Sequence, residues 1–547
     1  MTKGEVKLNR LTGQVTNKYA SYFDKSKSVS SVLEYGPRWT LSKETRGEDI
    51  KQYDKTYSKD IFTVVHKGND PSHKVKGLVV LGSKSHDKVL DTETHVTADG
   101  ATSVGYYDLM GNMFKATDYR GFNSTHTFDM NGKGIESVTP DSGKETYKWN
   151  GLGKVVSHGH IGWKVDYEYD NNLRLIKTSR KEDSAKAPLV TTYTWDTPVK
   201  GFFNIGHMTN VTQNYVQNNI NYNSDGLKAS KEWVVGDNKY DYTYSYFDGG
   251  VPKLMTYPDG SKLSYLYTVD GTLSTMQYED SKSKPSDMDK ITFSNYGLNA
   301  QPGTISYGKS IVLSRELDSW GRESKDTLSN GTTVLDSMEY IWDNTGNITS
   351  QVRNGDATTY TYDTSERLTG ATNKSRTLTY EYDKNDNLTK NGANTFVMDT
   401  KTNRLASGVV NGKSVVFKYD VSGRLLGDGE ETYTYGDSGR LELIVDSSGG
   451  KTNIGYFNKN KLYSSSNSRN ALYLDNGLEI TIKDKVTSFI KRLQIGGQTW
   501  EVINGDGTSS YVFPDRLRSQ LRTIDSKSLD STSSFEYEPY GASHEVK

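Results

Sequence analysis

The feature that most constrains this chain is an aromatic residue followed by Asp or Asn, which recurs about every 20 residues. The first series has spacings of 21, 21 and 20 residues and consists of Tyr107-Asp108, Phe128-Asp129, Trp149-Asn150 and Tyr169-Asp170. The second series has spacings of 20 and 20 and consists of Trp342-Asp343, Tyr362-Asp363 and Tyr382-Asp383. More divergent copies follow at Met398-Asp399, Tyr419-Asp420 and Tyr435-Gly436. A fixed period of this length indicates a repeat architecture.

Each repeat predicts a strand, a turn and a return strand. Alternating runs such as Tyr360-Thr-Tyr362 lead into the aromatic–Asp pair and predict a strand with its aromatic side chains on one face. Turn-forming residues follow, often with Gly at the fourth position after the aromatic. The Asp carboxylate can cap such a turn, and Gly can supply the positive φ. A polar and an aliphatic residue, as in Arg367-Leu368, then lead into the return strand.

We expect one set of residues to have a structural role in this repeat. They are Tyr107, Asp108, Gly111, Phe128, Asp129, Gly132, Trp149, Gly153, Tyr169, Asp170, Trp342, Asp343, Gly346, Tyr362, Asp363, Tyr382, Asp383, Tyr419, Asp420 and Gly423.

The length of the chain limits the shape of the resulting sheet. At ~20 residues per hairpin, 547 residues hold roughly 25 hairpins, or about 50 strands. Open sheets seldom exceed ~10 strands without curling, because successive strands are twisted. Only 33% of the residues are hydrophobic, too few for a sandwich of this size, whereas the 38 Tyr tolerate a wet surface. We therefore expect a sheet wound around a polar interior, and a filled multi-domain β protein stays open as the alternative.

Composition excludes several classes of function. The chain has 67 basic and 68 acidic side chains, so its bulk charge gives no signal for nucleic acid. The absence of Cys excludes a disulfide framework, a thiolate metal site and a cysteine nucleophile. No stretch approaches 18 apolar residues, and the segment 1–10 lacks the apolar core of a signal peptide. We expect no membrane insertion and no classical secretion signal.

Several segments resemble a known family. Tyr257-Pro-Asp-Gly260 with Tyr265–Leu273, and Thr139–Gly143 with Tyr147–Gly153, resemble the YD (Rhs) repeats of bacterial polymorphic toxins and Tc toxin shell subunits, which are related to those of animal teneurins. Leu8–Gly13 and Tyr35–Leu41 are similar, more weakly, to the start of Rhs shells. Tyr511–Ser519 and Glu536–Gly541 resemble the signature that closes the Rhs core, but Arg518 replaces the usual Gly and Glu538 the usual Asp.

This resemblance implies an all-β fold: a long meander of YD-repeat β-hairpins coiled into a spiral sheet that forms a hollow shell or part of one. We expect a diverged N-terminal cap at 1–97, YD/Rhs repeats at 98–445 and a closing region at 446–547. Because the chain stops at Lys547, six residues after Gly541, we expect the plug, the autoprotease and the toxin domain of such proteins to be absent.

The implied function is a non-enzymatic scaffold that encloses a toxin or effector polypeptide for delivery. We expect a partial shell, completed by a second shell-forming chain or a second copy, and a delivery machine as a further partner. No catalytic residue, cofactor, metal or nucleic-acid partner is expected. The implied location is the cytoplasm of a bacterial producer, followed by export through a dedicated secretion or injection system.

Two short motifs and two other classes of function compete with the repeat interpretation. His158-Gly-His160 could be half of a metal site, but it lies in an ordinary repeat. Asp383–Asn387 opens like a calcium loop, with Leu388 where Gly is required and Asn394 where the bidentate Glu belongs. An adhesin would use the aromatics as carbohydrate-stacking platforms. An enzyme would need convergent carboxylates, which we would seek in the diverged stretch 275–335.

Overall fold

The computed structural model describes residues 6–8, 15–20, 29–35, 41–46, 49–57, 61–69, 78–282, 290–297, 301–466, 469–483 and 486–545. All regular elements in these ranges are strands, numbered β1 to β51, so the predicted all-β meander of about 50 strands is confirmed. Across the same ranges, no helix has the length and apolar character needed to cross a membrane. The predicted segments Leu8–Gly13 and Tyr35–Leu41 lie largely outside the described residues.

The chain divides into two compact units, and each is described by itself. The first comprises residues 1–142, 294–305 and 311–415, and the second comprises 143–293, 306–310 and 416–547. The domain boundaries predicted at 97 and 445 are based on sequence similarity, whereas these two units are defined by compactness. The domain boundaries therefore stay a prediction.

The first unit contains two stretches of strands. The first stretch comprises β1 (Val6–Leu8), β2 (Val15–Ala20), β3 (Val29–Tyr35), β4 (Leu41–Arg46), β5 (Asp49–Tyr57), β6 (Ile61–Asn69), β7 (Leu78–Asp87), β8 (Thr92–Thr97), β9 (Thr102–Tyr107), β10 (Met113–Thr117), β11 (Asn123–Phe128) and β12 (Gly134–Thr139). The second stretch comprises β27 (Ile311–Leu317), β28 (Glu323–Asn330), β29 (Thr333–Trp342), β30 (Ile348–Arg353), β31 (Asp356–Tyr362), β32 (Leu368–Thr372), β33 (Thr377–Tyr382), β34 (Leu388–Asn391), β35 (Asn394–Met398), β36 (Leu405–Val410) and β37 (Lys413–Val416).

The second unit also contains two stretches. The first stretch comprises β13 (Gly143–Trp149), β14 (Val155–His160), β15 (Trp163–Tyr169), β16 (Leu175–Glu182), β17 (Leu189–Trp195), β18 (Met208–Gln213), β19 (Val216–Tyr222), β20 (Lys228–Val235), β21 (Asn238–Tyr246), β22 (Pro252–Thr256), β23 (Lys262–Tyr267) and β24 (Leu273–Glu279). The second stretch comprises β38 (Lys418–Tyr419), β39 (Leu425–Gly427), β40 (Thr432–Tyr435), β41 (Leu441–Val445), β42 (Lys451–Phe457), β43 (Asn460–Ser466), β44 (Arg469–Tyr473), β45 (Leu478–Lys483), β46 (Val486–Ile495), β47 (Gln498–Ile503), β48 (Ser509–Pro514), β49 (Gln520–Asp525), β50 (Ser531–Tyr537) and β51 (Ser543–Glu545). Strands β25 (Lys290–Tyr296) and β26 (Pro302–Tyr307) cross the unit boundaries.

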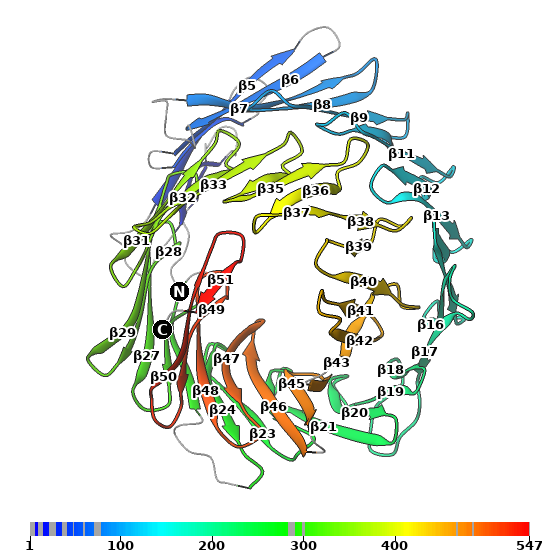
Figure 1. The fold of residues 1–547 in the computed structure, drawn as a ribbon, viewed down its shortest axis with the longest axis vertical. Helices are drawn as coiled ribbons and strands as arrows, with labels where there is room; N and C mark the ends of the chain where they lie inside the picture. The colour runs from blue at the N-terminus through cyan, green and yellow to red at the C-terminus, as the bar shows by residue number, and fades with distance from the viewer. Residues whose placement is uncertain are drawn as a thin grey trace. The chain divides into compact units, whose positions relative to one another are not determined.

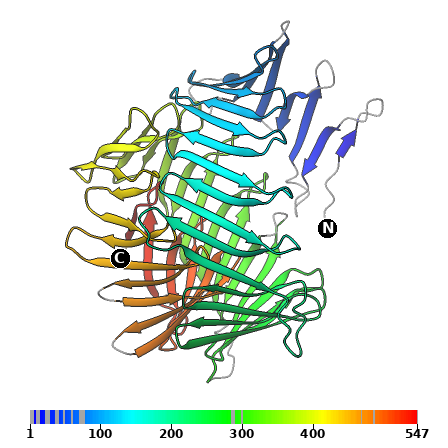
Figure 2. The same cartoon turned by 90° about the vertical axis from the view of Figure 1, so that its right-hand side faces the viewer.

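The strands form two open sheets of 37 and 14 strands, in which successive strands pair antiparallel. The hairpins follow one another as rungs, seen for β9–β12 in Figure 1 and for β13–β21 in Figure 2. Two kinds of turn therefore alternate. The turns after the aromatic–Asp pairs, such as 108–112, lie on one edge, which we call the YD rim. The turns that join one hairpin to the next, such as 118–122, lie on the other edge, which we call the linking rim.

A β-bulge recurs beside the aromatic residue of the repeat. In the β31–β32 hairpin the register runs from Thr361↔Gly370 to Tyr362↔Leu368, which places one extra residue in the return strand. The same shift occurs at Trp149↔Val155 and in most other repeats. Because a bulge bends its strand and increases the local twist, a bulge in successive hairpins curves the strip in one sense.

The Asp of the repeat accepts hydrogen bonds from the backbone of its own turn. The Oδ1 atom of Asp108 accepts hydrogen bonds from the backbone amides of Met110 and Asn112, both at 2.9 Å. Gly111 donates its amide to the Asp108 carbonyl at 2.9 Å and has a φ of 81°. Where the repeat lacks this Gly, Leu173 and Glu366 adopt φ values of 60° and 63°. The turn thus imposes the left-handed conformation on whichever residue occupies the position.

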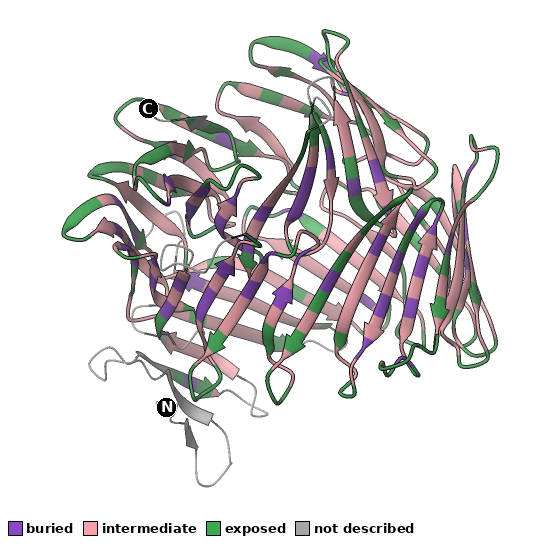
Figure 3. Ribbon diagram, turned by 90° about the horizontal axis from the view of Figure 1, so that it is seen from below, coloured by how far each residue is buried: buried purple, intermediate pink, exposed green. Residues whose placement is uncertain are grey.

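Buried residues are scattered in short bands along half-buried strands (Figure 3). The second unit has the larger aromatic core. There the Tyr307 ring lies 5.2 Å from that of Tyr511 and 4.8 Å from that of Phe513, and all three side chains are buried. In the first unit the buried apolar residues include Leu313, Leu328, Met338 and Tyr380.

The turn geometry predicts different effects for two glycines. A Cβ on Gly111 would meet no atom within 4 Å, so Gly111→Ala carries only the cost of a left-handed φ, about 1 kcal/mol. Gly151 has equal space but no positive φ, and Gly151→Ala should be neutral or slightly stabilising. Hydrogen exchange of each turn measures both effects. Equal effects of the two substitutions would contradict this explanation.

Candidate functional site

The polar tip of the repeat aromatic bonds to the preceding hairpin. The hydroxyl of Tyr362 donates to the carbonyl of Ile348 at 2.8 Å, and that of Tyr382 donates to Leu368 at 2.8 Å. Trp342 uses its indole Nε1 in the same way, donating to the carbonyl of Glu323 at 2.8 Å. Each acceptor is the first residue of the preceding return strand. The same bond joins Tyr169 to Val155, Trp195 to Leu175, Tyr222 to Met208 and Tyr537 to Gln520.

This bond closes an end of the sheet that the backbone leaves unpaired. The pairing of β30 with β31 ends at Ser350↔Thr359, three residues before Tyr362. The pairing of β14 with β15 ends at Ser157↔Asp166, again three residues before Tyr169. Beyond this point the two hairpins diverge at the YD rim, where no turn connects them. The aromatic tip spans the gap, which explains why Tyr and Trp prevail at this position.

An Arg five residues after the aromatic makes a second link between repeats. The Nε of Arg367 lies 2.7 Å from Asp363 Oδ2 in its own turn. Its Nη1 donates to the carbonyl of Asp383 at 3.2 Å, and its guanidinium lies 5.3 Å from the centre of the Tyr382 ring. Equivalent stacking places Arg174 over Trp195, Arg322 over Trp342, Arg424 over Tyr435 and Arg440 over Tyr456. The sequence interpretation gave these arginines no role, although their fixed spacing was the available signal.

The residues expected to build the repeat occupy equivalent places. The aromatics end the strand before the turn, namely Tyr107, Phe128, Trp149, Tyr169, Trp342, Tyr362, Tyr382 and Tyr419. The acids begin the turn, namely Asp108, Asp129, Asp170, Asp343, Asp363, Asp383 and Asp420. The glycines take positive φ, namely Gly111, Gly132, Gly153, Gly346 and Gly423. Hydrogen bonds from the side chain and the backbone amide of Asn112 lower the pKa of Asp108.

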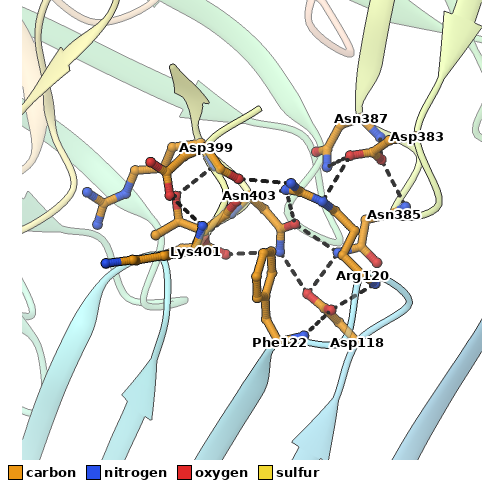
Figure 4. A network of polar contacts seen from close by, with 12 residues as sticks. Asp118, Arg120, Phe122, Asp383, Asn385, Asn387, Asp399, Lys401 and Asn403 are labelled. Atoms are coloured by element: carbon orange, nitrogen blue, oxygen red, sulfur yellow. Dashed lines mark hydrogen bonds and ion pairs between the residues drawn. The ribbon is translucent and has the colours of Figure 1, made fainter. Parts of the chain in front are cut away.

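In the first unit the linking rim of the first stretch contacts the YD rim of the second stretch (Figure 4). Arg120 is central to this seam. Its Nη1 donates to the carbonyl of Thr402 at 2.7 Å and its Nη2 to the carbonyl of Asp399 at 2.9 Å, while its Nε lies 3.4 Å from Asp383 Oδ2. The guanidinium also lies 4.9 Å from the centre of the Phe122 ring. One side chain thereby holds two turns of a distant stretch.

Amide side chains complete this first-unit seam. Asn385 and Asn403 donate from Nδ2 to Asp118 Oδ2, at 2.8 and 2.9 Å. The backbone amide of Asn403 donates to Asp141 Oδ1 at 2.6 Å. Burial alone would raise the pKa of Asp118, but bonds from Asn403, the Phe122 amide and Asn385 lower it below its usual value.

The segment that opens like a calcium loop is part of this seam. Asp383 Oδ1 accepts the backbone amides of Asn385 and Asn387 at 2.9 and 3.0 Å, and its Oδ2 accepts Asn387 Nδ2 at 2.9 Å. Both carboxylate oxygens of Asp383 thus accept hydrogen bonds within the turn that the calcium-loop interpretation concerns. Within the described ranges, no group of three or more His, Asp or Glu residues is arranged to hold a metal ion.

The second unit has a comparable seam built on buried ion pairs. Glu182, only 3% exposed, accepts from Arg180 Nη2 at 2.5 Å and from Arg424 Nη1 of the second stretch at 2.9 Å. Trp163 lies against Arg180, with 4.3 Å between guanidinium and ring centre. Further along, Trp233 Nε1 donates to Asp475 Oδ2 at 2.6 Å. A charge buried in this way is tolerated only when it is paired.

The two histidines singled out by sequence both contact Trp163, His158 with its ring edge-on at 4.8 Å. His158 stacks on Tyr147 with ring centres 4.3 Å apart, and its Nε2 lies 3.3 Å from Glu145 Oε2. His160 instead stacks on Trp163 at 5.3 Å. Both rings therefore pack in an aromatic ladder on one face of β13–β15.

The diverged stretch 275–335 does bring two carboxylates together. Arg315 Nε lies 3.4 Å from Glu323 Oε1 and 3.3 Å from Asp326 Oδ2. Burial raises the pKa of Asp326 to about 8, and Glu323 adds to this rise while Arg315 opposes it. Because the side chains of these three residues are at most 15% exposed, the pair has little access to a substrate.

The first-unit seam predicts a strong effect of Arg120. Arg120→Ala should cost about 2 kcal/mol of local stability, because charge-assisted hydrogen bonds are lost. Lys401→Ala, at an exposed position in the same cluster, should cost nearly nothing. Hydrogen exchange of segment 399–404 measures the difference. Unchanged protection in Arg120→Ala would show that Arg120 does not hold the seam.

Asp326 predicts a pH-dependent gain in stability. Its pKa in the fold lies above its ordinary value of 3.8, at about 8, so between these pH values the folded protein keeps a proton that the unfolded chain has released. Its contribution to stability therefore falls as the pH rises through this range. Asp326→Asn should be more stable than the parent at pH 7, by at least about 1 kcal/mol, with a smaller gain at pH 4. Urea unfolding tests this, with the exposed Glu316→Gln as control. An equal gain at both pH values would contradict the assignment.

Comparisons with known proteins agree with this architecture. Residues 286–461 match the family model of the teneurin YD-shell. The crystal structure of TcdB2-TccC3-TEV has a TM-score of 0.83 at 15% identity, covering 99% of this chain and 32% of that chain. A Photorhabdus luminescens Tc holotoxin pore with a mutation in TccC3 gives 0.82 at 16% identity, covering 99% and 32%. A crystal structure of TcdB2-TccC3 gives 0.78 at 14% identity, covering 99% and 33%.

This chain thus spans about a third of the length of the solved chains that it matches. No curated protein matches it. The resemblance inferred from the sequence is confirmed: part of the chain matches the teneurin YD-shell family model, and the chain has the fold of the TcdB2-TccC3 proteins.

Proposed function

We propose that this chain is a non-enzymatic wall component of a shell that encloses a toxin or effector polypeptide. One observation carries the proposal: the recurring functional groups of the repeat bind the strip to itself. Aromatic tips bond to the preceding hairpin, turn carboxylates bond to their own turns, and arginines bridge repeats. The match to the Tc toxin fold over 99% of the chain supports this assignment.

The physical mechanism is exclusion. A sheet whose ladders are closed at the YD rim, and whose stretches are sealed by seams, leaves few openings for a protease. The cargo would be kept away from the producing cell until the shell opens or engages a delivery machine. Parts of the wall would meet polar surroundings on both faces. This agrees with the composition of the chain, in which only 33% of the residues are hydrophobic.

The partners in this proposal are a cargo polypeptide, further shell-forming sequence and a delivery system. The proteins that share the fold are about three times longer than this chain, so a closed container would need additional wall. Residues 98–445 would supply the repeating wall and 446–547 its closing region. Production in a bacterial cytoplasm and export by a dedicated machine belong to the same proposal.

The carbohydrate-binding alternative is less consistent with the contacts of the aromatics. A stacking platform needs a free ring face. Arg174, Arg322 and Arg424 each lie about 5 Å from the ring centre of the next repeat's aromatic and occupy one face. We therefore place the repeat aromatics in the wall rather than in a glycan site.

Small-angle X-ray scattering tests the container directly. A solid globule of 547 residues should have a radius of gyration of about 24 Å. The proposal predicts a clearly larger radius, with pair distances skewed well beyond half of the maximum dimension. A radius near 24 Å with a symmetric distribution would contradict a hollow wall and favour a filled β protein.

A further inference from the structure

One turn on the YD rim of the second unit lacks the carboxylate of the repeat. In the turn before it, Asp420 Oδ1 accepts the backbone amides of Ser422 and Arg424, both at 2.9 Å. The next repeat aromatic is Tyr435, and Gly436 follows it in place of Asp. The first residue of this turn therefore has no side chain that could accept the turn amides.

The turn, residues 436–440, nevertheless keeps the ordinary backbone conformation. Gly436 donates its amide to the carbonyl of Arg440 at 3.1 Å, and Gly439 donates its amide to the carbonyl of Gly436 at 2.8 Å. Gly439 also has the positive φ that is typical of the repeat, 72°. Another group therefore takes the place of the missing Asp.

The carboxylate of Glu442 occupies the space of the missing side chain. A Cβ placed on Gly436 would overlap the carboxyl carbon and both carboxylate oxygens of Glu442. The Ser438 hydroxyl accepts the backbone amide of Arg440 at 3.2 Å and donates to Glu442 Oε1 at 3.4 Å. The amide that an Asp would accept directly is thus connected to a carboxylate through one hydroxyl.

The position of Glu442 in the turn has an electrostatic cost. Burial and the charge of Asp437 raise the pKa of Glu442, and hydrogen bonds from the hydroxyl and the backbone of Ser438 oppose this rise. The hydrogen bonds to the turn therefore offset the cost of placing a second carboxylate beside Asp437.

Glu442 is also the extra residue of the β-bulge in this hairpin. Its neighbours Leu441 and Leu443 pair with Tyr435 and Thr434, so Glu442 has no residue opposite it. Intact repeats have Thr at this place, namely Thr349, Thr369 and Thr389. Among the bulges that the described hairpins form beside a YD turn, this one alone has an acidic extra residue. The acid at the bulge thus coincides with the loss of the acid from the turn.

This turn lies on the second-unit seam. A Cβ placed on Gly439 would overlap the guanidinium of Arg180 in β16, so the backbone of the turn packs directly on that group. Arg180 Nη2 donates to Glu182 at 2.5 Å, and Glu182 also accepts from Arg424 Nη1 at 2.9 Å. The conformation of the turn therefore bears on a contact between two distant stretches.

We propose that Glu442 is a positioning residue of the second-unit seam: its carboxylate replaces the missing Asp of turn 436–440 and so keeps Gly439 packed on Arg180. The inference rests on the proposed function, because a closed seam matters to a wall that excludes proteases. It has a specific consequence. The carboxylate should be movable from position 442 to position 436 without opening the seam.

Hydrogen exchange of the full chain tests the role of Glu442. Glu442→Thr introduces the bulge residue of intact repeats. We expect roughly fivefold faster exchange in peptides covering 432–445 and in peptides covering 176–186, because the turn loses its carboxylate. Asp437→Asn, at an exposed position in the same turn, is the matched control and should leave both regions unchanged. Faster exchange confined to 432–445 would overturn the link to Arg180.

Gly436→Asp tests whether the carboxylate can be moved. Combined with Glu442→Thr, it restores the ordinary repeat, and exchange in both regions should return to within about twofold of the parent. In the parent, the same substitution should speed exchange, because its Cβ would overlap Glu442. Gly436 has no positive φ, so the backbone accepts Asp. An effect of the same sign in both backgrounds would overturn the proposal.

Scattering separates this role from the container. A compact scattering profile together with the expected reversal of sign would refute only the container. A hollow profile without the reversal would refute only the role of Glu442.

Discussion

The structure depends on hydrogen bonds from the tips of repeat aromatics, such as Tyr362, Tyr382 and Trp342, to backbone carbonyls of the preceding hairpins. Backbone pairing between hairpins ends three residues before the aromatic, as at Ser350↔Thr359 before Tyr362. Without this bond each junction would be open at the YD rim, and the strip would be joined only at its linking turns. Because the link connects nearest neighbours, stability is built up repeat by repeat. A long strip can therefore be ordered without a large aliphatic core.

The second constraint is that turns hold distant stretches together, beside the aromatic packing of Tyr307 on Tyr511 and Phe513 in the second unit. In the first unit Arg120 holds two turns more than 260 residues away in sequence, and Asp118 accepts two amide side chains there. In the second unit Glu182 is placed between two arginines. Polar rims give directional contacts, which fix the register between stretches better than apolar contact would.

The sequence predicts the repeat well because its period, the aromatic–Asp pair and the turn glycines are all local signals. Tyr362 ends β31, Asp363 directly follows it, and Gly346 has a positive φ. The seams could not be predicted, because which hairpin meets Asn403 depends on the accumulated bulges and twists of many repeats. The link made by Arg367 was missed because an Arg after a turn is also typical of a solvated strand. The pair Trp195-Asp196 was missed because it lies 26 residues after Tyr169 and so falls outside the 20-residue period.

The most direct test of this account is hydrogen exchange of peptides covering residues 343–362 in Tyr362→Phe. We expect a local loss of about 1 kcal/mol, or roughly fivefold faster exchange near Ile348, because one half-buried hydrogen bond is removed. Tyr107→Phe is the matched control, since the hydroxyl of Tyr107 makes no hydrogen bond to the described part of the chain. Unchanged exchange in Tyr362→Phe, or the same change in both variants, would contradict the claim that the aromatic tip closes the junction between hairpins.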